Sequence, residues 1–180
     1  MDLFETKLDG RLVYQGRIVN VREDRVRLPD GRVAAREVVE HSGGVGIVAL
    51  TDEGDVLMVR QFRYPMGEIV REIPAGKLEP GEDPAACAAR ELREETGYTC
   101  ARLDSLGVTY PSPGCYGEKL YLFLARTLTY VGQALDDQEF LVVESLPLDA
   151  LVAQIMSGEI KDGKTIIGVL KARWQLTIDD

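Results

Sequence analysis

Three glutamates, Glu91, Glu94 and Glu95, stand close together near the middle of the chain. In an α-helix Glu91 and Glu95 lie one turn apart on one face, and Glu94 lies beside them. Like charges at this spacing repel one another. Divalent cations such as Mg²⁺ or Mn²⁺ bind carboxylate oxygens and remove that repulsion. The spacing indicates a candidate metal site, although a solvated acidic face with ion pairs from Arg90 and Arg93 is the simpler interpretation of the spacing alone.

A capped helix must position these glutamates. The sequence predicts a helix over Pro84–Thr96, because Asp83 is a good N-cap, Pro84 suits the first helical position and Gly97 stops the helix. One face of it can be buried, through Ala85, Ala88, Ala89, Leu92 and Thr96. The preceding loop, Gly76–Glu82, is rich in Gly and Pro and permits tight turns. We expect this loop to bring the Ala75 carbonyl toward the same metal ions.

The loop and helix together resemble the Nudix box. The matching positions are Gly76, Glu82, Arg90-Glu91-Leu92, Glu94-Glu95 and Gly97-Tyr98, with Tyr98 an unusual choice at the last, apolar position. The resemblance implies Mg²⁺-dependent hydrolysis of a nucleoside diphosphate linked to another moiety. It also implies that Glu91, Glu95 and the Ala75 carbonyl bind the metal, with Glu94 as a further ligand or a group beside it. Arg90 and Glu82 would orient the carboxylates by ion pairing.

Other segments resemble one branch of this family, the bacterial ADP-ribose pyrophosphatases. Pro113 lies sixteen residues after Gly97, as in the proline marker of that branch, and Glu118 follows it. The likeness covers nearly the whole chain, in the segments Tyr14–Val21, Leu28–Gly31, Arg36–Leu50, Val59–Pro65, Glu72–Glu82 and Ser157–Thr165. It implies hydrolysis of ADP-ribose to AMP and ribose 5-phosphate. Cys115 and Gly117 depart from the usual loop, and Glu159–Thr165 also resembles GDP-mannose pyrophosphatases, so GDP-mannose and ADP-glucose stay open.

The same resemblance suggests how the substrate is held. Arg63 would contact it from its own subunit, with Pro113 and Glu118 in the substrate loop. Arg36 and Glu37 would reach the adenine side from a neighbouring subunit. The general base would come from the loop Gly132–Glu139, with Glu139 as first choice and Asp137 as second. An alternative that is equally simple is that Glu139 is only an acidic residue at the start of a strand and has no catalytic role.

Strands, one helix, more strands and two helices follow one another, which favours a mixed sheet with helices on both faces. We expect an α/β (α+β) protein with the Nudix fold, an α/β/α sandwich around a mixed sheet. The expected strands are Leu12–Tyr14, Ile18–Leu28, Arg32–Glu40, Val45–Leu50, Val56–Gln61, Ile69–Ile73, Ser105–Thr109, Leu120–Ala125 and Phe140–Ser145, and the closing helices are Leu148–Ser157 and Lys164–Leu176.

Two domains are expected: a small antiparallel β-subdomain over residues 1–42 and a Nudix hydrolase domain over residues 43–180, with Gly43-Gly44 as a hinge. The strands of the first have little apolar mass of their own, so they should pack on the main body or on a second subunit. In the family that the chain resembles, this subdomain reaches across a two-fold axis. A homodimer with a shared active site is therefore expected.

Composition narrows the class of function. The 180 residues carry a net charge of −9 and the pI is about 4.7, which argues against sequence-independent binding of nucleic acid. The single histidine, His41, and three cysteines with no zinc spacing exclude a histidine-based triad or zinc site built from this chain alone. A charged N-terminus and the lack of long apolar runs favour a cytoplasmic protein without membrane contact. A non-catalytic nucleotide-binding module, or a dimeric scaffold with incidental acidity, is the alternative to an enzyme.

Overall fold

The protein is described by a computed structural model that covers residues 2–179. The chain forms two compact units. The first is the chain up to Gly43 together with Tyr110–Lys119, and the second is Gly44–Thr109 with the chain from Leu120 onward. The segment with the proline marker thus belongs to the same unit as the N-terminal strands.

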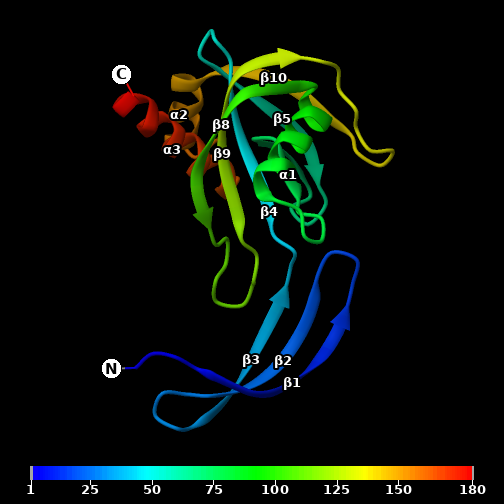
Figure 1. The fold of residues 1–180 in the computed structure, drawn as a ribbon, viewed down its shortest axis with the longest axis vertical. Helices are drawn as coiled ribbons and strands as arrows, with labels where there is room; N and C mark the ends of the chain where they lie inside the picture. The colour runs from blue at the N-terminus through cyan, green and yellow to red at the C-terminus, as the bar shows by residue number, and fades with distance from the viewer. Residues whose placement is uncertain (1, 180) are drawn as a thin grey trace. The chain divides into compact units, whose positions relative to one another are not determined.

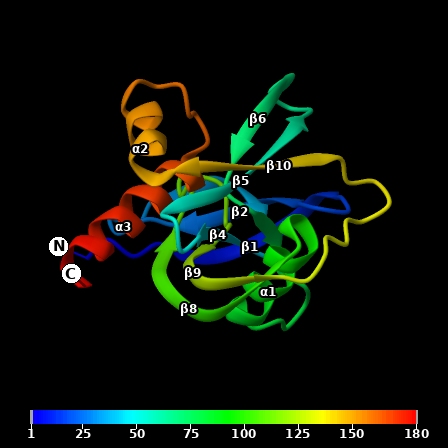
Figure 2. The ribbon, with the colours of Figure 1, turned by 90° about the horizontal axis from the view of Figure 1, so that it is seen from above.

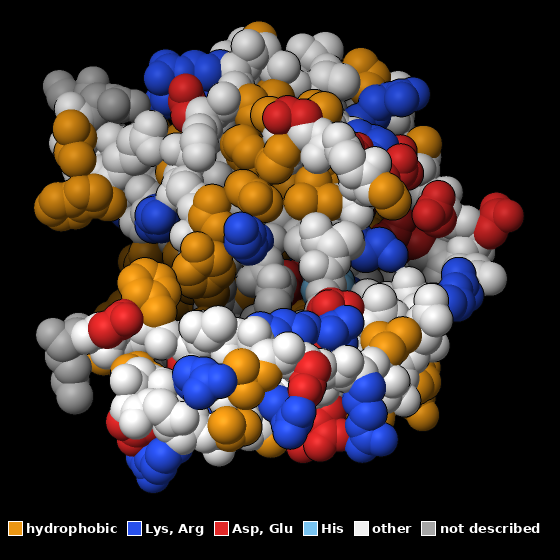
Figure 3. All heavy atoms as spheres, turned by 60° about the horizontal axis from the view of Figure 1, so that its bottom comes forward, with side chains coloured by type: hydrophobic (Ala, Val, Ile, Leu, Met, Phe, Trp, Pro, Cys, Tyr) orange, Lys and Arg blue, Asp and Glu red, His pale blue; other side chains and the backbone are white. Residues whose placement is uncertain are grey.

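The first unit contains a three-stranded antiparallel sheet in the order β1 (Thr6–Gln15), β2 (Asn20–Arg27) and β3 (Val33–Glu40). The turn before β3 has Gly31 at φ 87°, where a glycine is favoured. Oppositely charged side chains pair across the strands, for example Lys7 and Asp24 at 2.7 Å. Figure 3 shows basic and acidic side chains interleaved on this sheet, with apolar ones between them. Leu12 and Tyr14 of β1 are among the exposed apolar side chains.

The second unit contains a seven-stranded sheet in the order β10-β5-β4-β9-β8, with β6 beside β5 and β7 beside β4 (Figure 1). Only the pair β4–β9 among these is parallel, so the sheet is mixed, as predicted. The strands are β4 (Gly44–Leu50), β5 (Asp55–Arg63), β6 (Glu68–Glu72), β7 (Ala75–Lys77), β8 (Tyr98–Thr109), β9 (Leu120–Tyr130) and β10 (Leu141–Pro147).

Both faces of this sheet are covered, because side chains alternate along its buried strands. Val45 and Ile47 of β4 pack in one core cluster with Ala88 of helix α1 (Pro84–Glu91). Val48, which points the other way, packs with residues of α2 (Leu148–Met156) and α3 (Gly163–Asp179). Figure 2 shows α1 and α3 on opposite sides of the strands. The expected sandwich of helices around a mixed sheet is confirmed.

Element boundaries differ from expectation in several places. Strand β1 is much longer than the predicted Leu12–Tyr14, and β8 begins at Tyr98 rather than Ser105. Strand β9 continues past Ala125 to Tyr130. The added part of β1 is exposed, and the added parts of β8 and β9 are at most partly buried, so none of them shows the strict apolar alternation that marks a strand in the sequence. None of the helices within residues 2–179 combines the length and the apolar character needed to cross a membrane.

Candidate functional site

The helix that carries the glutamates begins and ends where its caps predict. Asp83 Oδ2 accepts hydrogen bonds from the N–H groups of Ala85 (3.0 Å) and Ala86 (3.1 Å), and Gly97 ends the segment at φ 79°. One expectation is corrected: α1 stops at Glu91, and Leu92–Thr96 form a π-helical turn. A π turn changes the register of an α-helix, so residues four apart no longer stack on one face. Here Glu95 is buried with Leu92 and Thr96, whereas Ala85 and Ala89 are exposed.

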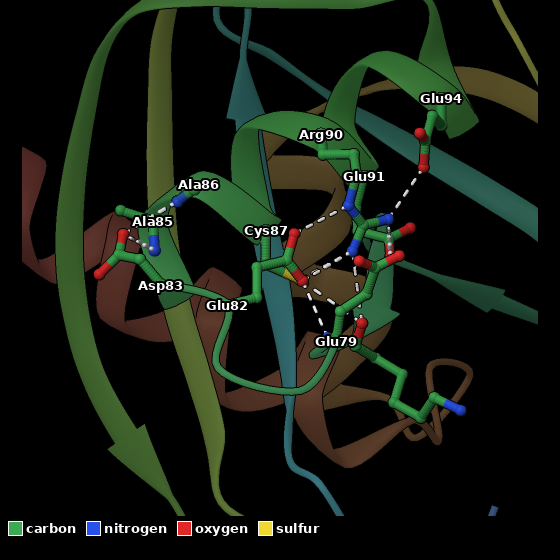
Figure 4. A network of polar contacts seen from close by, with 10 residues as sticks. Glu79, Glu82, Asp83, Ala85, Ala86, Cys87, Arg90, Glu91 and Glu94 are labelled. Atoms are coloured by element: carbon green, nitrogen blue, oxygen red, sulfur yellow. Dashed lines mark hydrogen bonds and ion pairs between the residues drawn. The ribbon is translucent and has the colours of Figure 1, made fainter.

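Arg90 is the centre of a carboxylate network (Figure 4). Its guanidinium donates to Glu82 through Nε (2.9 Å) and Nη2 (3.0 Å). Nη1 donates to Glu91 (2.7 Å) and to Glu94 (3.0 Å). The hydrogen bond from Arg90 is the main reason that the pKa of Glu82 falls to about 2, assisted by the backbone N–H of Glu79. One cation thus holds three carboxylates in fixed positions. Helical spacing alone indicated ion pairs of Arg90 with the neighbouring glutamates, whereas its pairing with Glu82 was indicated only through the family resemblance.

Gly76 is required by the position of Glu91. A Cβ atom on Gly76 would lie 1.8 Å from the Glu91 carboxyl carbon and 1.9 Å from its Oε1. The glycine lies in β7, which pairs with β4 and thereby fixes the start of the expected loop. The side chain of Glu91 therefore passes directly over the backbone of β7.

Glu95 is an almost completely buried carboxylate, with 1% of its surface exposed. Its Oε2 accepts a hydrogen bond from the backbone N–H of Ala75 at 2.9 Å. Burial raises the pKa of Glu95 to about 8, and the charges of Glu139 and Glu91 add to this shift. Burial also raises the pKa of Glu91, against the opposing effect of Arg90. The structure thus brings the predicted ligands Glu91 and Glu95, the backbone of Ala75 and the charge of Glu139 into one environment.

This environment suits a divalent cation. Mg²⁺ is bound in proteins through one or two carboxylates, with water and substrate phosphates filling its other positions. Glu95 is buried and Glu91 is partly buried, and burial and like charge oppose the ionisation of both, so a cation would stabilise their charged forms. Among residues 2–179, no group of three or more His, Cys, Asp or Glu side chains is placed so that it could hold a metal ion. The two carboxylates of Glu91 and Glu95 have the chemistry of donors to a divalent cation that takes further ligands from outside this pair.

Arg63 lies within electrostatic reach of Glu95. Its Nε and Nη2 donate to the two oxygens of Glu72, at 2.6 and 2.8 Å. The Glu72 hydrogen bond is the main reason that the pKa of Arg63 is raised, and the charge of Glu95 contributes. A cavity of about 430 Å³ opens beside this pair and is lined in part by Arg63, Pro65, Met66, Val70, Glu72 and Lys164. Glu72 was not predicted as a site residue from the sequence. The feature that could have pointed to it is its place directly before Ile73, which is buried.

Glu139 lies just before β10 and lines a second cavity of about 430 Å³ with Gln61, Phe62 and Phe140. Its backbone N–H donates to the Asp136 carbonyl at 2.9 Å. Since its charge raises the pKa of both Glu91 and Glu95, it lies within electrostatic reach of both. Asp137, the second choice for a base, is exposed.

The other predicted substrate residues belong to the first unit. Arg36 in β3 pairs with Glu5 (2.9 Å from Nε), and Glu37 is exposed opposite Glu23. The loop with Pro113 and Glu118 is fixed to β3 by two backbone hydrogen bonds of 2.8 Å, from Val39 N–H to the Cys115 carbonyl and from Gly117 N–H to the Val39 carbonyl. The structure thus groups Arg36 and Glu37 with the proline loop, and the carboxylates with Arg63 and Glu139.

The His41 ring, with an 8% exposed side chain, packs beside Glu118. Its Nδ1 lies 3.5 Å from Glu118 Oε1 and accepts a hydrogen bond from Gly43 N–H at 3.0 Å. Tyr116 contacts the same ring, at 5.6 Å between centroids. These contacts give His41 a structural role in its unit.

The chain is similar to several known proteins. An ADP-ribose pyrophosphatase of Bacillus subtilis (strain 168) is 40% identical over 93% of this chain and 91% of its own length. A methanol dehydrogenase activator of Bacillus methanolicus is 42% identical over 93% of this chain and 92% of its own. A crystal structure of an ADP compounds hydrolase superposes with a TM-score of 0.87 over 99% of this chain and 98% of the other, at 20% identity, and supports the fold.

Two family models match the chain itself. The model of the nucleoside diphosphate sugar hydrolase N-terminal domain matches residues 5–39, which include the three strands of the first unit from β1 nearly to the end of β3. The model of the NUDIX domain matches residues 28–166, well over half of the chain and all of the carboxylate helix. Given this match and the two relatives at 40% and 42% identity, the chain belongs to the Nudix family.

Proposed function

We propose that this protein hydrolyses the pyrophosphate bond of a nucleoside diphosphate sugar, with ADP-ribose as its substrate and AMP and ribose 5-phosphate as products. The observation that carries the proposal is the pair of carboxylates Glu91, which is hydrogen-bonded to Arg90, and Glu95, which is buried and acts electrostatically on Arg63. The identity with the Bacillus subtilis ADP-ribose pyrophosphatase supports the choice of sugar nucleotide. GDP-mannose and ADP-glucose are the alternatives that a substrate panel must test.

Glu91, Glu95 and the Ala75 carbonyl would hold Mg²⁺, for which Mn²⁺ is a possible substitute, and the bound ion would neutralise the phosphates and acidify water. Arg90 and Glu82 fix the orientation of Glu91, and Glu94 adds negative charge at the same point. Because Arg90 would orient the carboxylates that surround the metal site, it makes contacts with three of them.

The remaining groups act on substrate and water. Arg63 presents the free N–H groups of its guanidinium to a phosphate oxygen, since Glu72 occupies only Nε and one N–H of Nη2. Glu139 would accept the proton of the water that attacks phosphorus, because it is an acidic residue whose charge acts on both Glu91 and Glu95. Arg36, Glu37, Pro113 and Glu118 are proposed to bind the nucleoside and sugar ends.

We also propose a homodimer in which the first unit contributes to a shared site. Of the apolar side chains on its strands, Val26 is buried, whereas Leu12, Val13 and Tyr14 are 47%, 58% and 58% exposed. A sheet with this much exposed apolar surface requires a further partner surface. A cytoplasmic location is expected for such an enzyme and would be tested by cell fractionation.

Hydrolysis of a panel of nucleoside diphosphate sugars, with Mg²⁺ and with excess EDTA, tests the function. We expect Mg²⁺-dependent release of AMP and ribose 5-phosphate from ADP-ribose, faster than release from ADP-glucose or GDP-mannose. Glu95→Gln should lower kcat by at least about 100-fold, because several kcal/mol of transition-state stabilisation depends on the metal. Equal turnover with EDTA, or unchanged turnover in Glu95→Gln, would refute the proposal.

A further inference from the structure

The segment Asp162–Thr165 belongs to a polar network in the second unit that joins the start of α3 to the end of β6. Thr165 Oγ1 accepts a hydrogen bond from the backbone N–H of Ile73 (2.9 Å) and donates one to Asp162 Oδ2 (2.6 Å). Asp162 Oδ2 also accepts from the backbone N–H of Thr165 at 2.9 Å, as a helix N-cap does. Thr165 is completely buried. Thr165, at the start of α3, therefore holds the backbone directly after the residue that precedes Ile73.

That residue is Glu72, which is 2% exposed and holds two cations. Its carboxylate accepts two hydrogen bonds from Arg63 and a third contact from Lys164 Nζ, which also lies 3.1 Å from Asp162 Oδ1. A buried carboxylate is costly unless it is paired and hydrogen-bonded, and here both oxygens are occupied. Lys164 contacts the same Oε2 of Glu72 as Arg63 Nη2 does, so the charge of Glu72 is compensated by two cations and not by Arg63 alone.

We infer that Glu72 is a positioning residue, which orients Arg63 so that the free edge of its guanidinium faces the substrate phosphates. A bidentate arginine–carboxylate pair fixes the plane and the direction of the guanidinium. The Arg63 side chain is 40% exposed, so its remaining N–H groups are accessible while one edge is held at the buried carboxylate. Glu72 touches neither substrate nor metal in this assignment and acts only through Arg63. This inference rests on the proposed function.

A double-mutant cycle separates positioning from a merely structural role. Glu72→Gln removes one of the two acceptor oxygens and should lower kcat/KM by about tenfold, the usual effect of losing a hydrogen bond between charged groups. Arg63→Ala should lower it by about 10- to 100-fold. Adding Glu72→Gln to Arg63→Ala should then change kcat/KM by less than about twofold, because the residue that Glu72 positions is absent. Both single variants should divide their effect between kcat and KM in the same way.

Two further variants make the result decisive. Glu72→Asp keeps the charge but withdraws the carboxylate, and it should lose as much activity as Glu72→Gln; it also serves if Glu72→Gln does not fold. Asp149→Asn removes an exposed carboxylate that pairs with Arg173 at 3.0 Å on the helices of the same unit, and it should leave kcat/KM unchanged. Thermal unfolding of every variant reports whether the fold is retained.

The possible outcomes are distinct. If the wild-type enzyme is active and Glu72→Gln lowers kcat/KM as much in the Arg63→Ala background as in the wild type, the positioning role is overturned and the proposed function stands. Loss of thermal stability in Glu72→Gln and Glu72→Asp with unchanged kcat/KM would also overturn it. A wild-type protein that turns over no nucleoside diphosphate sugar with Mg²⁺ would overturn the proposed function, and the positioning role with it.

Discussion

Glu95 should make the stability of the metal-free protein depend on pH. Its pKa is raised from 4.5 to about 8, chiefly by burial, so the native state favours the protonated acid. Between pH 4.5 and about 8 the unfolded state releases this proton and the native state keeps it, so the free energy of unfolding falls as pH rises. Above about pH 8 the loss is complete and amounts to a few kcal/mol at most.

Urea unfolding in EDTA at pH 5 and pH 8.5 measures this effect. Glu95→Gln, which cannot ionise, should lose less stability between the two values than the wild type, and Mg²⁺ should stabilise the wild type more at the higher pH. A wild-type protein whose stability relative to Glu95→Gln is the same at both pH values would contradict the burial argument.

Arg90 should not be replaceable by lysine. Its guanidinium reaches Glu82, Glu91 and Glu94 at once, which a single ammonium group on a flexible stem cannot do with the same geometry. Arg90→Lys should therefore lower kcat by about 10- to 100-fold, as is usual when a group that orients metal ligands is lost. Arg93→Lys, an exposed position of the same segment, should be close to neutral in the same assay. Similar activities of the two variants would remove Arg90 from the mechanism.

The carboxylate helix shows what its sequence could and could not predict. Its limits follow from Asp83, Pro84 and Gly97, because capping is decided by neighbouring residues. The π-helical turn was missed, because it depends on how Leu92, Glu95 and Thr96 pack in the interior, and no Gly or Pro marks it. Family resemblance named the proposed metal ligands, whereas Glu72 was missed because Lys164, its partner, lies 92 residues away.

Strand β7 should tolerate no side chain at Gly76 as long as Glu91 keeps its length. A Cβ atom there would approach the Glu91 carboxylate to 1.9 Å, well inside van der Waals contact. Gly76→Ala should reduce kcat by displacing Glu91 and should lower the melting temperature. Shortening the opposing residue in Gly76→Ala/Glu91→Ala should recover part of the stability and none of the activity. If the double variant is no more stable than Gly76→Ala, the clash with Glu91 is not the cause.

At the scale of the whole molecule, the mixed sheet was predictable from the order of strands and helices along the chain, and the two-unit organisation was only partly predictable. Gly43 closes the N-terminal part of the first unit, yet Tyr110–Lys119 also belongs to it. That segment joins β3 through backbone hydrogen bonds to Val39. These residues are far apart in sequence, so no local sequence pattern predicts the contact. Loops that bind ligands are commonly fixed by such long-range contacts to a rigid element.

The exposed apolar strand β1 leads to a final prediction about assembly. If the first unit forms the dimer interface, Leu12→Glu, which places a charge on an exposed apolar position, should shift the protein toward monomers in sedimentation velocity. Activity on ADP-ribose should fall in parallel, since Arg36 and Glu37 are proposed to reach the site of the partner. Met156→Glu, a substitution at a 74% exposed position on α2, is the matched control and should leave both properties unchanged. A monomeric Leu12→Glu protein with full activity would show that each subunit carries a complete site.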